Sequence, residues 1–175
     1  MKYRRIKLIL QYNKIAAGEV VDRPSNIVKE LIENSIDAGA SEVRVVVRKA
    51  GKTLIQVIDN GIGIPNEDII IAFERHTSSK IRNISDLEKL TTLGFRGEAL
   101  ASIAAVSKLE IISRIETEEN GVHLFIEGSK IVNKREVSCP IGTNIKVKNI
   151  FYNLPARQKF LKKDSTELGH ITDIV

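Results

Sequence analysis

The sequence runs Glu30-Leu31-Ile32-Glu33-Asn34-Ser35-Ile36-Asp37-Ala38-Gly39 and then, after a pair of strand-like stretches, Asp59-Asn60-Gly61-Ile62-Gly63-Ile64. These two stretches decide the expected fold. The first predicts an amphipathic helix over residues 24–38, because Asp22 is a good N-cap, Pro24 suits the first turn and Gly39 is a natural stop. At about 100° per residue, its apolar side chains form one face: Ile27, Val28, Leu31, Ile32, Ile36 and Ala38.

The opposite stripe of this helix is polar. Glu30 and Asn34 are four residues apart, so their side chains are neighbours on that stripe. Such a stripe usually faces solvent. Its two amides among the acids, with Lys29 only at the margin, also suit a ligand-binding face, and the residues of the helix alone leave both interpretations open.

The second stretch follows a buried strand, Leu54 to Ile58, and ends it with an acid. Gly61 and Gly63 allow positive φ or a close approach of the backbone to a ligand. An ordinary Asp-Asn-Gly turn would have the same sequence pattern. A carboxylate only accepts hydrogen bonds when ionised, so Asp59 could alternatively receive the exocyclic amine of adenine and reject guanine.

A third stretch, Gly94 to Leu100, places glycines before an apolar helix expected near 98–106. Free N–H groups at such a helix start favour an anion, and Arg96 could add a charged contact. A simple capping loop is the alternative. The hydroxyl-rich run Arg75 to Lys80 is expected to be either a lid or a surface loop.

Together these stretches resemble the N-terminal ATPase region of the MutL DNA mismatch repair proteins, within the GHKL ATPase superfamily. The loop Phe95 to Leu100 resembles the mismatch repair branch specifically. The resemblance covers about residues 12 to 175 and rests on these segments: Lys14 to Val21, Glu30 to Ala40, Asp59 to Ile64, Arg75 to Ile81, Leu93 to Leu100, Gly142-Thr143 and Asn149 to Arg157.

The resemblance implies a role for each matching residue. Glu30 matches the general base, Asn34 the magnesium ligand and Asp59 the adenine-reading carboxylate. Gly63 matches a position beside that carboxylate, Thr143 a position that supports the base from a strand, and Ala38 a small position that lines the pocket. The lid corresponds to Ser78, Ser79 and Lys80, and the phosphate loop to Gly94, Phe95, Arg96, Gly97, Glu98, Ala99 and Leu100. The family usually reads Ala-Thr-Ser-Lys in the lid, where this chain has Thr77-Ser78-Ser79-Lys80.

The fold class expected is α+β: a two-layer sandwich of the GHKL (Bergerat) type, with helices on one face of a mixed, mostly antiparallel sheet. An N-terminal arm, residues 1–20, is expected to precede the ATPase domain, residues 21–175. Strands are expected near 42–49, 52–58, 107–115, 121–127, 131–138 and 143–148, and further helices near 66–73, 155–163 and 165–174. The last expected helix has no Gly or Pro that would end it, so we expect a fragment that stops before the second domain of the family.

The composition limits the classes of function that the chain can have. The chain is 42% hydrophobic and 28% charged, as in globular proteins, and no apolar run approaches the roughly 18 residues of a membrane span. Neither a secretory signal nor a metal-binding Cys/His spacing is present, and Cys139 is the only cysteine. A net charge of +5 favours polyanions. The basic segment Arg157, Lys159, Lys162 and Lys163 predicts either a solvated helix face or sequence-independent DNA contact through phosphates.

The function predicted is mismatch repair of the MutL type, in which ATP and Mg²⁺ are bound, ATP is slowly hydrolysed and an N-terminal clamp is switched. A non-hydrolysing ATP-binding switch or matchmaker is the alternative; a DNA-binding module with a degenerate nucleotide site is disfavoured because every pocket element is present. The resemblance implies DNA, a MutS-type mismatch-recognition protein and ATP-dependent self-dimerisation as partners, and no membrane. The expected location is the cytoplasm, at the nucleoid, in a bacterium or the nucleus in a eukaryote.

Overall fold

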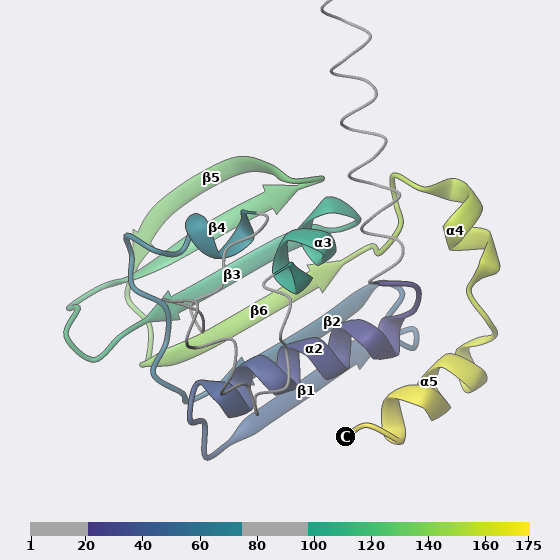
Figure 1. Ribbon diagram of the computed structural model, residues 1–175, viewed down its shortest axis with the longest axis horizontal. Coiled ribbons are helices and arrows are strands. Elements are labelled where there is room, and N and C mark those ends of the chain that lie inside the picture. The colour runs from purple at the N-terminus through teal and green to yellow at the C-terminus, as the bar shows by residue number, and fades with distance from the viewer. Residues whose placement is uncertain (1–20, 75–97) are drawn as a thin grey trace, which may run out of the picture.

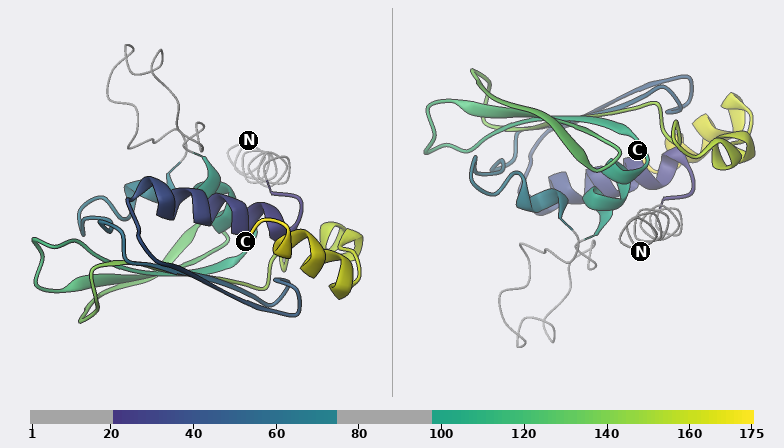
Figure 2. Two further views of the ribbon diagram at one scale, coloured as in Figure 1. Left: turned by 90° about the horizontal axis from the view of Figure 1, so that it is seen from below. Right: turned by 90° about the horizontal axis from the view of Figure 1, so that it is seen from above.

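The computed structural model describes residues 21–74 and 98–175, and it shows an antiparallel sheet with helices on one face (Figures 1 and 2). The sheet has six strands in the order β1-β2-β6-β3-β4-β5. Their bounds are β1 Val43–Arg48, β2 Leu54–Asp59, β3 Lys108–Arg114, β4 Gly121–Glu127, β5 Lys130–Val137 and β6 Gly142–Lys148. The expected α+β sandwich is confirmed. All pairings between these described strands are antiparallel, whereas a mixed, mostly antiparallel sheet was predicted.

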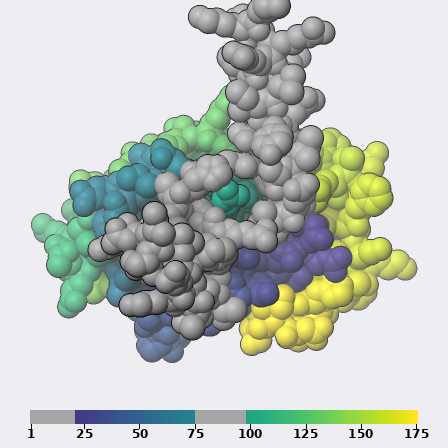
Figure 3. Space-filling view, viewed as in Figure 1, coloured from purple at the N-terminus to yellow at the C-terminus, as the bar shows by residue number. Residues whose placement is uncertain are grey.

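Two helices and a short 3-10 turn lie over the sheet: α2 Pro24–Asp37, α3 Ala99–Ala105 and η1 Ile71–Phe73. Two more, α4 Pro155–Phe160 and α5 Asp164–Thr172, lie beyond one end of the strands. Figure 3 shows α5, in yellow, at the surface next to the purple α2, and the two helices are in contact.

The core lies between these helices and the inner face of the sheet. Strand residues alternate between buried and half-buried positions along β2 and β3, as expected when one face is covered. Leu109 and Ile111 of β3 and Ile55 of β2 are fully buried in one continuous apolar cluster with Ile27 and Leu31 of α2, and α2 itself contacts β2. This packing fixes which face of α2 meets the sheet.

Two details of α2 differ from the sequence prediction. Its N-cap is Arg23 rather than Asp22: the Arg23 amide donates to Oδ1 of Asn26 at 3.2 Å. Ile36, expected on the apolar face, is 57% exposed, whereas Ser35 is 2% exposed. The buried stripe follows the helical angle through Val28, Leu31 and Ser35, and a hydroxyl can enter it because it finds buried partners.

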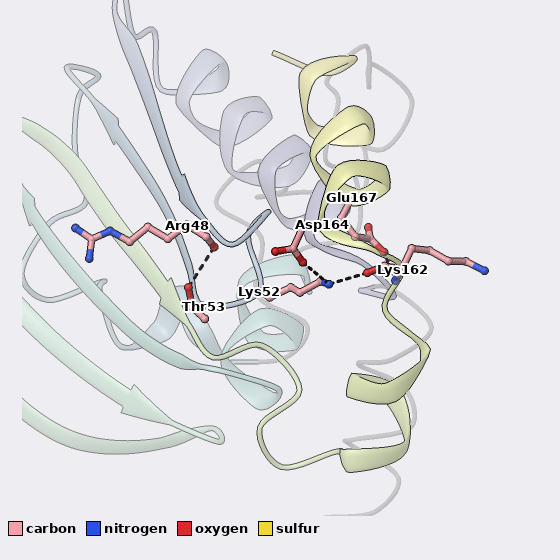
Figure 4. Close-up of polar contacts among 6 residues, drawn as sticks. All are labelled: Arg48, Lys52, Thr53, Lys162, Asp164 and Glu167. Atoms are coloured by element: carbon pink, nitrogen blue, oxygen red, sulfur yellow. Dashed lines mark hydrogen bonds and ion pairs between the residues drawn. The ribbon is translucent and has the colours of Figure 1, made fainter.

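The C-terminal helices are shorter than expected. The chain leaves α4 at Leu161 and re-enters a helix only after Lys163, with extended backbone at both residues. Figure 4 shows the polar contacts at this break: Lys52 Nζ lies 2.6 Å from the Lys162 carbonyl and 2.7 Å from Asp164 Oδ1. The helix expected near 66–73 is likewise reduced to turns followed by η1. Within the described residues, no helix combines the length and the apolar character needed to cross a membrane.

Candidate functional site

A cavity opens between the second half of α2 and the inner face of the sheet. It is lined from three sides, by the helix, by β2 and β6, and by the start of α3. The residues that line it are Leu31, Asn34, Ser35, Ala38, Val57, Asp59, Gly63, Ile64, Leu100, Thr143 and Ile145.

Asp59 ends β2 at the polar wall of this cavity, and three donors hold its carboxylate. Oδ1 accepts the amide of Gly61 at 2.9 Å and the amide of Thr143 at 3.3 Å. Oδ2 accepts the hydroxyl of Ser35 at 2.8 Å. Since each carboxylate oxygen can accept two hydrogen bonds, Oδ2 keeps one acceptor site for a ligand donor.

Thr143 stands beside Asp59 on β6 and has a hydroxyl partner of its own. The register of the sheet places Asp59, Thr143 and Ser113 in one row across β2, β6 and β3. Ser113 Oγ lies 3.0 Å from Thr143 Oγ1 and 3.0 Å from the carbonyl of Gly142, and it accepts the amide of Ile64 at 2.9 Å. A polar row therefore crosses three strands of an otherwise apolar face.

Two glycines let the loop after Asp59 lie against this row. Gly63 has φ +77°, and a side chain there would collide with the carbonyl oxygen of Arg114. Gly142 has φ +115°, and a side chain there would collide with the carbonyl oxygen of Asp59. Both positions combine a left-handed backbone with a close backbone approach, so both need glycine.

Glu30 and Asn34 lie one turn apart on the polar stripe of α2. Asn34 lines the cavity, and Glu30 is half-buried on the same stripe. Nearby, Glu33 forms an i,i+4 ion pair with Lys29 at 3.8 Å. The stripe thus borders the cavity and is not simply a solvated surface.

A magnesium ion bound with a nucleotide needs few protein ligands, because phosphates and water supply most of its coordination. The described part of the chain holds no group of three or more His, Cys, Asp or Glu suited to a metal. The Asn34 amide offers a hard oxygen at the cavity wall. This donor fits Mg²⁺ accompanied by a nucleotide and does not fit a metal held by protein alone.

The structure brings together six of the residues that the sequence predicted for the site: Asn34, Ala38, Asp59, Gly63, Leu100 and Thr143. Glu98 and Ala99 lie at the start of α3 and do not line the cavity. The predicted lid residues Ser78, Ser79 and Lys80, and Gly94, Phe95, Arg96 and Gly97 of the phosphate loop, lie outside the described residues, as does the arm 1–20.

Ser35 and Ser113 are the residues that the sequence analysis missed. The polar partner of Ser35 comes from another element, 24 residues away along the chain. The Thr143 partner of Ser113 lies 30 residues away. The helical angle of Ser35, in line with Val28 and Leu31, was the one signal available beforehand.

Comparison with known proteins agrees with this geometry. Residues 23–157 match the family described as histidine kinase-, DNA gyrase B- and HSP90-like ATPases. The DNA mismatch repair protein MutL of Bacteroides fragilis is 57% identical over 159 residues, covering 91% of this chain and 25% of that protein. MutL of Koribacter versatilis is 54% identical over 163 residues, covering 93% of this chain and 25% of that protein. The chain therefore spans about a quarter of the length of these relatives.

Solved structures show the same likeness. The Aquifex aeolicus MutL ATPase domain complexed with ADP superimposes with a TM-score of 0.69 at 38% identity, covering 89% of this chain and 54% of that one. The N-terminal domain of a DNA repair protein gives a TM-score of 0.74 at 31% identity, covering 93% of this chain and 45% of that one.

Proposed function

We propose that this chain, which belongs to the MutL DNA mismatch repair family within the histidine kinase-, DNA gyrase B- and HSP90-like ATPases, binds ATP with Mg²⁺ and hydrolyses it slowly. The observation that carries the proposal is the Asp59 carboxylate. Three protein donors hold it at the wall of a cavity that also contains Asn34. The likeness to an ATPase domain crystallised with ADP supports a nucleotide as the ligand.

Asp59 would read the base. Its free acceptor site on Oδ2 suits the 6-amino group of adenine and opposes the 6-oxo group of guanine. The apolar side chains of Leu31, Val57 and Ile145 line the same cavity and suit the faces of a purine ring. Gly63 allows the backbone to lie close beside the ring.

The polar stripe of α2 would serve the phosphates. Mg²⁺, when bound, neutralises phosphate charge, and Asn34, which lines the cavity, would hold it through its amide oxygen. Glu30 lies one turn earlier and would take the proton from the attacking water as general base, a role typically contributing 10²–10⁴-fold in rate. The lid and phosphate loop, including Ser78, Ser79, Lys80 and Arg96, would hold the phosphates in the same scheme.

The nucleotide would act as a switch for the repair reaction. We infer that ATP switches the N-terminal clamp, drives self-dimerisation in the natural protein and couples a MutS-type partner to downstream repair. The exposed side chains Lys159, Lys162 and Lys163, with Arg157, would contact DNA phosphates, so this binding is expected to weaken steeply with salt. Action at DNA would require the protein to be at the nucleoid of a bacterium or in the nucleus of a eukaryote.

The test of this function is Glu30→Ala, measured for both binding and turnover. A general base acts only in the chemical step, so ATP affinity should stay within about threefold while hydrolysis falls by about 10²-fold or more. Glu33→Ala, on the same helix, is the matched control and should keep activity. Loss of affinity as large as the loss of rate would show that Glu30 binds and does not catalyse. Intact affinity in a wild-type protein that never hydrolyses ATP would favour the non-hydrolysing switch.

A second variant tests the metal ligand. Asn34→Ala should remove most of the gain in ATP affinity that Mg²⁺ gives the wild type, because the protein oxygen on the ion is lost. Isothermal titration with and without Mg²⁺ measures this gain, and binding without metal should change little. An unchanged Mg²⁺ effect in the variant would assign the ion to other ligands.

A further inference from the structure

We propose that Ser113 is a positioning residue whose Oγ accepts a hydrogen bond from the Thr143 hydroxyl. The polar wall of the cavity then accepts hydrogen bonds and does not donate them. The consequence is selection of a 6-amino purine over a 6-oxo purine. This inference rests on the proposed function and adds to it a specificity residue that lies behind the cavity lining, not in it.

The hydrogen bonds around Ser113 fix the direction of its proton. A serine hydroxyl has one proton and two acceptor sites. The Ile64 amide can only donate, so it occupies one acceptor site of Oγ at 2.9 Å. The Gly142 carbonyl can only accept, so the Ser113 proton points to it at 3.0 Å. The remaining acceptor site faces Thr143 Oγ1 at 3.0 Å and receives the threonine proton.

This arrangement satisfies all the groups around Ser113, which is 1% exposed. The reverse direction, with Ser113 donating to Thr143, would take the serine proton away from the Gly142 carbonyl. Burial makes unpaired polar groups costly, so the fully satisfied arrangement is favoured. Thr143 therefore presents only lone pairs to the cavity.

Asp59 presents the same character beside it. Oδ1 is occupied by two backbone amides and Oδ2 by the Ser35 hydroxyl, which leaves one acceptor site. Asp59 and Thr143, which are partners across β2 and β6, thus both line this wall as acceptors. The amino group of adenine carries two N–H donors and suits such a pair, whereas a 6-oxo group brings a third acceptor against them.

The experiment measures the ratio of ITP to ATP dissociation constants, because inosine lacks the 2-amino group of guanosine and differs from adenosine only in its 6-oxo group and the N1 proton that accompanies that group. Ser113→Ala frees the Thr143 proton to donate to the 6-oxo group. The preference for ATP over ITP should fall by about tenfold, the effect of one buried hydrogen bond. Ser107→Ala is the matched control: its hydroxyl is also buried and donates to a carbonyl, that of Ile103, and it does not line the cavity. That variant should keep the ratio.

Coupling to Thr143 separates positioning from general loosening. Loosening would weaken ATP and ITP together and leave their ratio unchanged. In a Thr143→Val background, Ser113→Ala should produce no further change of the ratio, because the proton it controls is gone. If Ser113→Ala does not fold, Ser113→Cys keeps the shape with a weaker acceptor and should lower the ratio partially.

Two results would overturn the inference: a ratio within about twofold of wild type in Ser113→Ala, or an equal fall of the ratio with and without the Thr143 hydroxyl. A wild-type protein that binds neither nucleotide would refute the proposed function itself, which distinguishes the two failures.

Discussion

The Asp59 carboxylate is held so firmly that the effect of a single atom change can be argued. In Asp59→Asn, the amide oxygen should take the place of Oδ1, because the amides of Gly61 and Thr143 can only donate to it. The amide nitrogen then occupies the place of Oδ2 beside Ser35. The Ser35 hydroxyl can accept from it and donate instead to the Leu31 carbonyl at 3.1 Å.

The second proton of that amide nitrogen would point into the cavity where an acceptor stood. We expect Asp59→Asn to lose at least about tenfold in ATP affinity and to lose much less, or gain, for GTP and ITP. Competition titrations with the three nucleotides measure this, with Asn60→Ala as a nearby control outside the cavity. Equal losses for all three would mean that Asp59 does not read the base.

The sequence predicted those cavity residues that stand in recognisable motifs. Asn34, Asp59 and Thr143 stand in stretches that resemble a known family, and the cavity unites them. Ser35 and Ser113 could not be found in the same way, because a serine in a helix or strand is compatible with many environments. Their importance comes from partners on other elements, which only the three-dimensional structure identifies.

At the scale of elements, alternation and turn residues predicted each strand of the described residues to within about two residues. In β2 and β3 the reason is that one buried face imposes a strict period of two. The break between α4 and α5 lies earlier than predicted: helices were expected over 155–163 and 165–174, whereas α4 ends at Phe160 and α5 begins at Asp164. Lys162 and Lys163 are good helix formers, so local propensity favoured continuation. The break is stabilised from outside by Lys52, and from within by Glu167, whose Oε1 accepts the Lys162 amide at 2.8 Å.

Charged pairs on the uncovered face of the sheet give a pH dependence. Glu110 of β3 accepts a hydrogen bond from Lys148 of β6 at 2.6 Å, and this bond lowers the pKa of the Glu110 carboxyl despite its partial burial. A pKa lower in the folded than in the unfolded state stabilises the fold above the unfolded pKa. That contribution disappears as the pH falls through the folded pKa.

We therefore expect Glu110→Gln to be less stable than wild type by about 0.5 kcal/mol at pH 7, the usual size for a pair on a solvated face. The difference should shrink as the pH falls through the folded pKa of Glu110, and it should vanish once wild-type Glu110 is protonated as well. Urea unfolding over a series of acidic pH values measures it, with the exposed Glu136→Gln on β5 as control. A difference that does not shrink as the pH falls would assign the effect to packing and not to charge.

At the scale of the whole molecule, α3 links the cavity to the C-terminal helices. Its start contributes Leu100 to the cavity, and two loops cap its end. The amides of Ser129 and Gly128 donate to the carbonyls of Ala104 and Ser107, at 3.1 and 3.2 Å. The loop from β6 to α4 donates as well, through the Phe151 amide to Val106 at 2.7 Å and through Asn153 Nδ2 to Ala105 at 2.9 Å.

That second loop is strained and therefore depends on its anchors. Phe151 has φ +59° although it is a bulky residue, and it is fully buried. Such a backbone persists only where surrounding contacts hold it. α4 begins directly after this loop, at Pro155, so the hydrogen bonds to α3 also fix where α4 starts.

Asn153 provides the anchor that a substitution can remove cleanly. Asn153→Ala leaves the Ala105 carbonyl without its donor and should cost about 1 kcal/mol. Asn153→Asp keeps the shape but turns an ionised oxygen toward that carbonyl, so it should cost more, about 2–3 kcal/mol, at pH 7. Urea unfolding measures this order of stability. Hydrogen exchange of the α4 amides should become faster in both variants, because the loop that positions α4 has lost its hydrogen bond to α3.

Asn133→Asp on the exposed strand β5 is the control. If Asn153→Asp is as stable as the wild type, α3 does not hold this loop.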